Sequence, residues 1–190
     1  IKILNLSTGQ LSQSLRATTT SGMTQDGSQI AVLDYEKEQD AFIDIVHTTT
    51  NKRIASIPTP DEFDPGNDNH PYIVLGPNGK GLAWIWNNST KGTRGVTGAI
   101  TKISFWNDVT MEWNHLTAPN DFNRQPYSGG MPVVDLAINP SGDRALLSDD
   151  SSIKIIDTQT SRVISSVNLE AVPYVITFDA SGDRVVFGYG

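Results

Sequence analysis

The sequence predicts an all-β protein, and three observations indicate this fold class. Short runs rich in Val, Ile, Thr, Trp and Tyr follow one another along the 190 residues, as expected for strands. Clusters of Gly, Pro, Asn, Asp and Ser separate these runs, and no segment has a convincing apolar period of about 3.6 residues, which a helix would require. Two short patterns also recur four times each. A repeating all-β fold is therefore expected.

The first recurring pattern predicts a tight hairpin. In order along the chain it consists of an apolar residue, two residues of any type, Asp, Asn or Ser followed by Gly, two more residues of any type, and three largely apolar residues. Asp-Gly, Asn-Gly and Ser-Gly supply the positive φ that a tight turn between antiparallel strands requires. The four copies lie at 23–32, 75–84, 138–147 and 178–187.

The second pattern predicts another hairpin. Ile, any residue and two apolar residues are followed by a short polar residue or His, then by a polar turn and a further strand. The copy that starts at Ile43 is one residue longer than the other three. The four copies lie at 1–11, 43–54, 103–113 and 153–163.

The two patterns alternate, which gives a unit of four antiparallel strands, here called a to d. The turn glycines of the first pattern lie 52, 63 and 40 residues apart, close to the roughly 40 to 50 residues of four-stranded blade repeats. The chain resembles the WD-repeat family of β-propellers on this spacing and on two motifs. Ser141–Arg144 and Ser181–Gly188 resemble the family's turn into strand b, and degraded forms of its Trp-Asp pair end each strand c. These are Leu4-Asn5, Val46-His47, Trp106-Asn107 and Ile156-Asp157.

The resemblance implies a single domain over residues 1–190, with four blade equivalents. Three blades are expected at 16–58, 71–117 and 131–169, and the fourth combines 172–190 with 1–15. Two arrangements stay open: a closed ring of four blades, or part of a larger propeller. The chain opens at Ile1 directly into an alternating apolar run, so we expect a piece of a longer protein or a processed product.

Composition excludes several function classes. The net charge of −7 argues against a nucleic-acid partner, whose phosphates need a clustered basic surface. No apolar run approaches the roughly 18 residues of a membrane span. The absence of cysteine excludes disulfides, a thiolate zinc site and a cysteine nucleophile. It leaves the compartment open, with an intracellular one slightly favoured.

Strand parity predicts where binding occurs. The a–b and c–d turns are short and lie at one end of the blades, whereas the b–c and d–a connections lie at the other end. All long insertions fall in the second set, and long loops on a rigid scaffold commonly carry binding. The insertions are Glu36–Ala41, Thr59–His70, Asn87–Gly98 and Thr117–Gly130.

Three groups of residues are candidates for a site. Phe63, Phe122, Arg124 and Tyr127 are of the aromatic and Arg types enriched at protein interfaces, although the aromatics could instead fold back over the blade ends. Asp61, Asp64 and Asp68 lie in an acidic loop with the oxygen ligands that Ca²⁺ prefers. Their order does not match the calcium-loop pattern, so a solvated loop is favoured. The four tryptophans fall in one blade, where core packing is favoured over a stacking platform. They are Trp84, Trp86, Trp106 and Trp113.

The expected function is that of a non-enzymatic protein–protein interaction scaffold. The WD-repeat resemblance and the long-loop end indicate it, whereas no catalytic motif and no cofactor fingerprint occurs in the chain. We therefore expect no cofactor and an unidentified protein partner, with further blades or domains of a parent chain as other neighbours. The alternative is a propeller that binds a small ligand, or is enzymatic, at its central channel.

Overall fold

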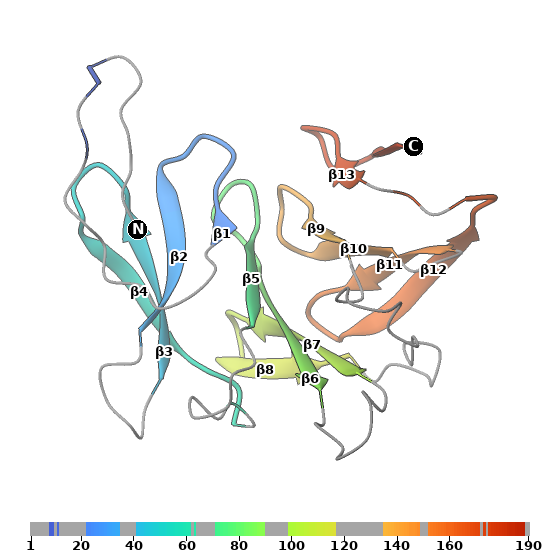
Figure 1. The fold of residues 1–190 in the computed structure, drawn as a ribbon, viewed down its shortest axis with the longest axis horizontal. Helices are drawn as coiled ribbons and strands as arrows, with labels where there is room; N and C mark the ends of the chain where they lie inside the picture. Colours follow the sequence, from blue (N-terminus) through green and yellow to red (C-terminus); the bar gives the residue numbers. More distant parts are fainter. Residues whose placement is uncertain are drawn as a thin grey trace.

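The computed structural model describes residues 8–9, 11, 22–34, 41–61, 63, 71–89, 99–116, 135–148, 152–171, 173 and 175–188, with the backbone alone at 86–89 and 99–101. All regular structure in this part of the chain is β-strand (Figure 1). Its strands are β1 (Gly22–Met23), β2 (Gln29–Asp34), β3 (Phe42–His47), β4 (Arg53–Pro58), β5 (Tyr72–Leu75), β6 (Leu82–Ser89), β7 (Ala99–Asn107), β8 (Glu112–His115), β9 (Leu136–Ile138), β10 (Arg144–Ser148), β11 (Ser152–Asp157), β12 (Arg162–Asn168), β13 (Val175–Phe178) and β14 (Val185–Gly188).

These strands form antiparallel sheets in which neighbours in sequence are neighbours in space. The sheets β1–β4, β5–β8 and β9–β12 each have four strands, and β13 pairs with β14. Such a meander is what short hairpin turns impose, since a tight turn can only join adjacent antiparallel strands. The predicted four-stranded unit is confirmed in the first three sheets.

The a–b turns form as their glycines predict. The turn glycines Gly27, Gly79, Gly142 and Gly182 have φ between 70° and 81°. In each turn the glycine N–H donates a hydrogen bond of 2.9–3.0 Å to the carbonyl three residues earlier. The local chemistry of Asp-Gly, Asn-Gly and Ser-Gly is therefore sufficient to place all four hairpins.

The three described c–d turns explain why a short polar residue or His ends their strands c. Asn107 Oδ1 accepts hydrogen bonds from the N–H groups of Val109 and Thr110, at 2.9 and 3.1 Å. Asp157 Oδ1 accepts from the N–H of Thr160 at 2.8 Å, and His47 Nδ1 takes the equivalent role in the first sheet. The last residue of strand c thus caps its own turn, which Asn, Asp and His can all do.

One predicted connection is shorter than expected. Residues 87–89 continue β6 and pair with β7, through Asn87 with Thr101, Asn88 with Ile100 and Ser89 with Ala99. The expected insertion Asn87–Gly98 is therefore wrong at its start, and the connection spans 90–98. Backbone pairing satisfies the N–H and C=O groups whatever the side chains are, so polar Asn residues do not end the strand.

The sheets stack side by side, with apolar clusters between them. Leu33 and Ile43 of the first sheet pack in one cluster with Trp84 of the second. Phe105 of the second sheet shares a cluster with Leu147 of the third. A third cluster joins β10 and β11 to β13. Each side chain of this size stabilises the fold by about 1.5–3 kcal/mol when it is fully buried.

The first strand of each sheet lines a common axis. β1 contacts β5, β5 contacts β9, and β9 contacts β13, and Figure 1 shows the sheets fanning outward from these strands. Asp135 ties β13 to the third sheet, because its Oδ2 accepts a hydrogen bond of 2.9 Å from the N–H of Ile176. This radial order of strands is the geometry of propeller blades.

One expectation about the ends of the fold is not tested. The expected fourth blade combines 172–190 with 1–15, and most of 1–15 lies outside the described residues, so this pairing stays a prediction. In the part of the chain that the structure describes, no helix is long and apolar enough to cross a membrane.

Candidate functional site

Short and long connections between strands lie at opposite ends of the blades. Turns within the a–b and c–d hairpins are short at every described position, such as 24–28, 108–111 and 158–161. The longer gaps between strands, at 35–41, 59–71, 90–98 and 116–135, all join strand b to c or strand d to a. Because the strands of each sheet run in meander order, these connections leave the blades at the end opposite to the hairpin turns.

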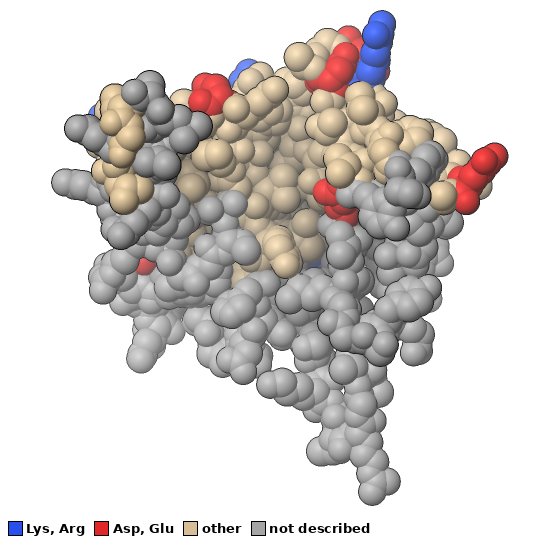
Figure 2. Space-filling model, turned by 45° about the horizontal axis from the view of Figure 1, so that its top comes forward, with Lys and Arg blue, Asp and Glu red and all other residues tan. Residues whose placement is uncertain are grey.

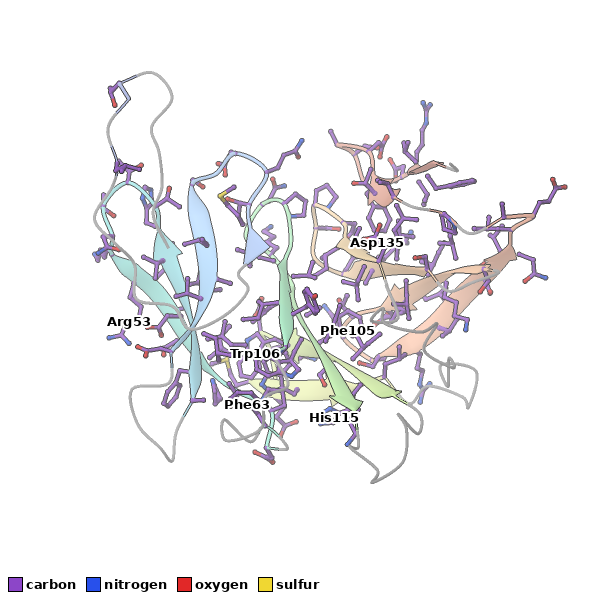
Figure 3. The ribbon with its side chains drawn as sticks, in the orientation of Figure 1. Arg53, Phe63, Phe105, Trp106, His115 and Asp135 are labelled. Carbon is purple, nitrogen blue, oxygen red and sulfur yellow. The ribbon has the colours of Figure 1, made fainter. Side chains whose placement is uncertain are left out.

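Phe63, in the connection between β4 and β5, packs onto the core. Its ring meets Trp84 edge-on with centroids 5.1 Å apart, and its N–H donates a hydrogen bond of 2.9 Å to Pro60 O. The side chain is half-buried against the cluster that joins the first two sheets (Figure 3). The structure therefore uses Phe63 to fix one long connection to the scaffold.

Most of the other sequence-predicted site residues are not among those that the structure describes. Phe122, Arg124 and Tyr127 lie outside the described residues, as do Asp64 and Asp68. Asp61 is exposed. Among the described residues, no group of three or more His, Cys, Asp or Glu side chains could hold a metal ion.

Trp84, Trp106 and Trp113 form a cluster of edge-on rings between the first two sheets. Trp84 and Trp106 are buried, at 2% and 7% exposure. Trp113 lies edge-on to both, with centroids 6.5 and 5.5 Å away, and its Nε1 donates a hydrogen bond of 2.7 Å to Pro58 O of the first sheet. Core packing is confirmed for Trp84 and Trp106, since their rings leave no open face for a ligand.

The a–b turns of neighbouring blades contact one another in a continuous row. The N–H of Gln25 donates to Pro77 O at 3.0 Å, which links the first turn to the second. Asn78 Nδ2 donates to Pro140 O at 3.3 Å, which links the second turn to the third. A Cβ on Gly182 would lie 3.1 Å from Cδ of Pro140, so the fourth turn also touches the third. The turns are thus held by one another as well as by their strands.

Beneath this row lies a cavity of about 320 Å³ on the axis. Its walls come from the inner strands and their turns in all four sheets, so no single blade forms it. Gln25, Thr177 and Asp179 supply polar side chains. The apolar walls include Met23, Val74, Leu75, Ile138, Pro140 and Phe178. Figure 2 turns this end toward the reader and shows uncharged side chains in the middle of the described surface, with charged ones around them.

Three carboxylates in the a–b turns have pKa values below their ordinary range. Hydrogen bonds from Ser28 N–H, Thr24 and the Ser28 hydroxyl lower the pKa of Asp26. The Ser141 hydroxyl and the Asn139 amide lower that of Asp143. For Asp179, desolvation raises the pKa, but hydrogen bonds from its own turn outweigh desolvation and the net shift is downward. All three carboxylates are therefore ionised at neutral pH.

Two polar pairs on strands c and d were not anticipated from the sequence. Ser104, 2% exposed, lies opposite His115, with 2.8 Å between Oγ and Nδ1. In the first sheet the same positions hold Asp44 and Ser56, which are 2.7 Å apart, and Arg53 reaches the Asp44 carboxylate at 3.2 Å (Figure 3). An alignment of the copies of the second pattern, extended through strand d, would have shown that the two residues of each pair lie opposite each other. Because the pairs recur at one position, we assign them to blade structure.

Comparison with known proteins identifies the fold. No family model and no curated protein matches the sequence. Hydrazine synthase of Kuenenia stuttgartiensis is similar in structure, with a TM-score of 0.58 and 10% identity over 100% of this chain and 64% of that one. The β-propeller domain of Cps50 (Swd1) from Myceliophteria thermophila has a TM-score of 0.56 and 14% identity, over 98% of this chain and 55% of that domain's chain. TolB from Acinetobacter baumannii has a TM-score of 0.52 and 18% identity, over 98% and 42% of the two chains.

These likenesses extend over nearly all of this chain but over only 42–64% of the length of the similar chains. At such low identities a structural likeness carries the fold and leaves function to the site itself. The sheet topology, the radial order of inner strands and these neighbours agree. The chain has the fold of a β-propeller, with its blades arranged as antiparallel sheets around one axis.

Proposed function

We propose that the chain is a non-enzymatic protein–protein interaction scaffold of WD-repeat type, which binds its partner through the end that carries the b–c and d–a connections. One observation carries the proposal. Every longer gap between strands joins b to c or d to a, so the longer connections gather at a single end of a rigid frame. Rigid sheets with long connections at one end are a common way to build a binding surface.

The frame supports this proposal because it is tied together between blades. Trp84, Trp106 and Trp113 join the first two sheets, and Phe63 anchors the connection between β4 and β5 to them. A partner that binds such a surface would order few residues of the frame, so less of the binding energy is lost as entropy. Phe63, Phe122, Arg124 and Tyr127 are the residues we propose for the contact.

The experiment compares the two ends of the propeller in one assay. Arg124→Ala with Tyr127→Ala changes the long-loop end, and Lys80→Ala with Arg184→Ala changes exposed side chains at the a–b turns. Each tagged variant is cross-linked in extract from the source cells, and captured proteins are quantified by mass spectrometry. We expect the first variant to lose the proteins that the unchanged chain and the second variant both retain. If only the second variant loses them, the proposed end is wrong.

A second candidate function, ligand binding at the central channel, is favoured by the cavity of about 320 Å³ on the axis. Pockets that bind small ligands commonly start at roughly this size, about 300 Å³. The two functions use opposite ends of the blades, so either can hold without the other.

A further inference from the structure

The axial cavity has the size of a small group rather than of a folded segment. At about 320 Å³ it offers room for roughly ten waters, each of which occupies about 30 Å³ in the liquid. Its walls are held by the bonded row of a–b turns, from Gln25 to Pro77 and from Asn78 to Pro140. The site is thus largely formed before any ligand arrives, as binding pockets commonly are.

Apolar side chains form part of the cavity wall. Val74, Leu75 and Ile138 reach the cavity from the second and third sheets, and Phe178 reaches it from β13. Apolar side chains cannot replace the water around a polar group, and an amide or hydroxyl left without a partner costs about 1–3 kcal/mol in proteins. The part of a ligand that contacts these side chains is therefore apolar.

Asp179 gives the cavity its charge. Among the described residues that line the cavity, Asp179 is the one with a formally charged side chain. Hydrogen bonds from Arg184 N–H, Ser181 and Asp183 N–H outweigh desolvation and lower its pKa, so the carboxylate is ionised. This negative charge on the cavity wall favours a ligand that carries a positive charge.

The carboxylate also retains hydrogen-bonding capacity. Oδ1 of Asp179 accepts from Asp183 N–H at 3.1 Å, from Arg184 N–H at 3.2 Å and from the Ser181 hydroxyl at 3.0 Å. Oδ2 accepts from the same hydroxyl at 3.0 Å. An ionised carboxylate offers about four acceptor positions on its two oxygens, so Oδ2 can still receive a donor from a ligand.

We propose that this cavity binds an ammonium or guanidinium group on a short apolar stem, with the Asp179 carboxylate as its counter-charge. The inference rests on the second candidate function, ligand binding at the central channel. Such a group occurs in free alkylamines and in the side chains of lysine and arginine. The stem contacts the apolar walls, and the charged head donates a hydrogen bond to Oδ2.

The test uses the complete 190-residue chain and defined probes. N-acetyl-lysine methylamide and N-acetyl-arginine methylamide represent a protein side chain, and n-pentylamine represents a free amine. N-acetyl-norleucine methylamide and n-pentanol keep the stem but carry no charge. Binding is followed through the NMR methyl signals of Met23 and Ile138, which line the cavity wall. The melting temperature is the second measurement, because a ligand that binds only the folded chain stabilises it.

The chain offers a variant that removes the charge and keeps the turn. Asn139 takes the place of Asp179 in the third a–b turn, where its Oδ1 accepts from Arg144 N–H at 3.0 Å, as Asp179 does from Arg184 at 3.2 Å. Asp179→Asn is therefore expected to fold. Asp183→Asn is the matched control, because it removes a carboxylate from the same turn that does not line the cavity.

We expect charged probes to shift both methyl signals, and Asp179→Asn to weaken their binding about tenfold, the loss typical of one hydrogen bond to a charge. Asp183→Asn leaves the affinity unchanged. If the lysine and arginine amides bind but pentylamine does not, the natural ligand is a protein side chain. If pentylamine binds as tightly as the amides, a free amine is sufficient as the ligand. If uncharged probes bind as tightly as charged ones, the cavity is a ligand site but the role of Asp179 is refuted. If no probe shifts either signal, ligand binding at the channel is itself refuted.

Discussion

Met111 provides a direct test of the turn geometry on which these blades depend. It lies in the β7–β8 turn with φ of 58°, and Asn51 holds the equivalent position in the β3–β4 turn with φ of 54°. In both turns this residue's N–H donates a 2.9 Å hydrogen bond to the carbonyl four residues earlier. The left-handed region costs most L-residues about 1–2 kcal/mol, whereas Asn adopts it more readily.

The expected effect follows from this strain, because the Met111 side chain is 66% exposed and its removal loses little packing. We expect Met111→Asn to raise the free energy of unfolding by about 1 kcal/mol. In a domain of this size that change raises the melting temperature by about 2–4 °C.

Urea denaturation followed by tryptophan fluorescence measures the change. The midpoint is expected to rise while the slope stays constant, because the surface exposed on unfolding is unaltered. The reciprocal variant Asn51→Met is the matched control and is expected to lose about the same free energy. An unchanged midpoint in Met111→Asn, together with a tolerated Asn51→Met, would refute the strain argument.

Two further predictions concern the a–b turns. Gly27 and Gly142 have φ of 70° and 81°, but a Cβ on Gly27 meets nothing within 4 Å, whereas one on Gly142 lies 2.8 Å from Gly81 N. Gly27→Ala is expected to cost about 1 kcal/mol and Gly142→Ala a further 1–3 kcal/mol or so from overpacking; equal midpoints in urea would contradict the close approach of the two turns. The lowered pKa values of Asp26, Asp143 and Asp179 stabilise the fold above the unfolded value of 3.8 and cease to do so as the pH falls through the folded values. Urea midpoints between pH 7 and 3 should therefore fall less in a variant with Asn at all three positions than in the unchanged chain, and parallel curves would exclude these turns as the source.

Local chemistry determined much of the fold. Gly27, Gly79, Gly142 and Gly182 placed the a–b hairpins, because a tight turn that contains a positive-φ glycine is encoded by the residues within it. The polar residue at the end of strand c placed the c–d hairpins for a similarly local reason, as Asn107 and its turn show. Because every described hairpin turn is short, the order of strands in each sheet followed, and with it the end at which the long connections emerge.

The candidate site could be anticipated only in part. Phe63 was singled out from its residue type, but its contact with Trp84 depends on how the first two sheets pack. The extension of β6 to Ser89 was also missed, since backbone pairing with Ala99 does not depend on the polar side chains that suggested a loop.

The axial cavity was decided by tertiary structure alone. Met23, Val74, Ile138 and Phe178 lie in four separate repeats and meet only because the inner strands gather around one axis. In the sequence, Asp179 is an ordinary polar residue that precedes a Ser-Gly turn, at the position of Asn139 in the preceding repeat. Asp179 lines the cavity and places a negative charge on its wall, whereas Asn139 is not among the lining residues. Turns are set by residues close together in the chain, whereas a cavity is set by the packing of distant strands, so the sequence by itself determined the blades and the tertiary structure determined the space between them.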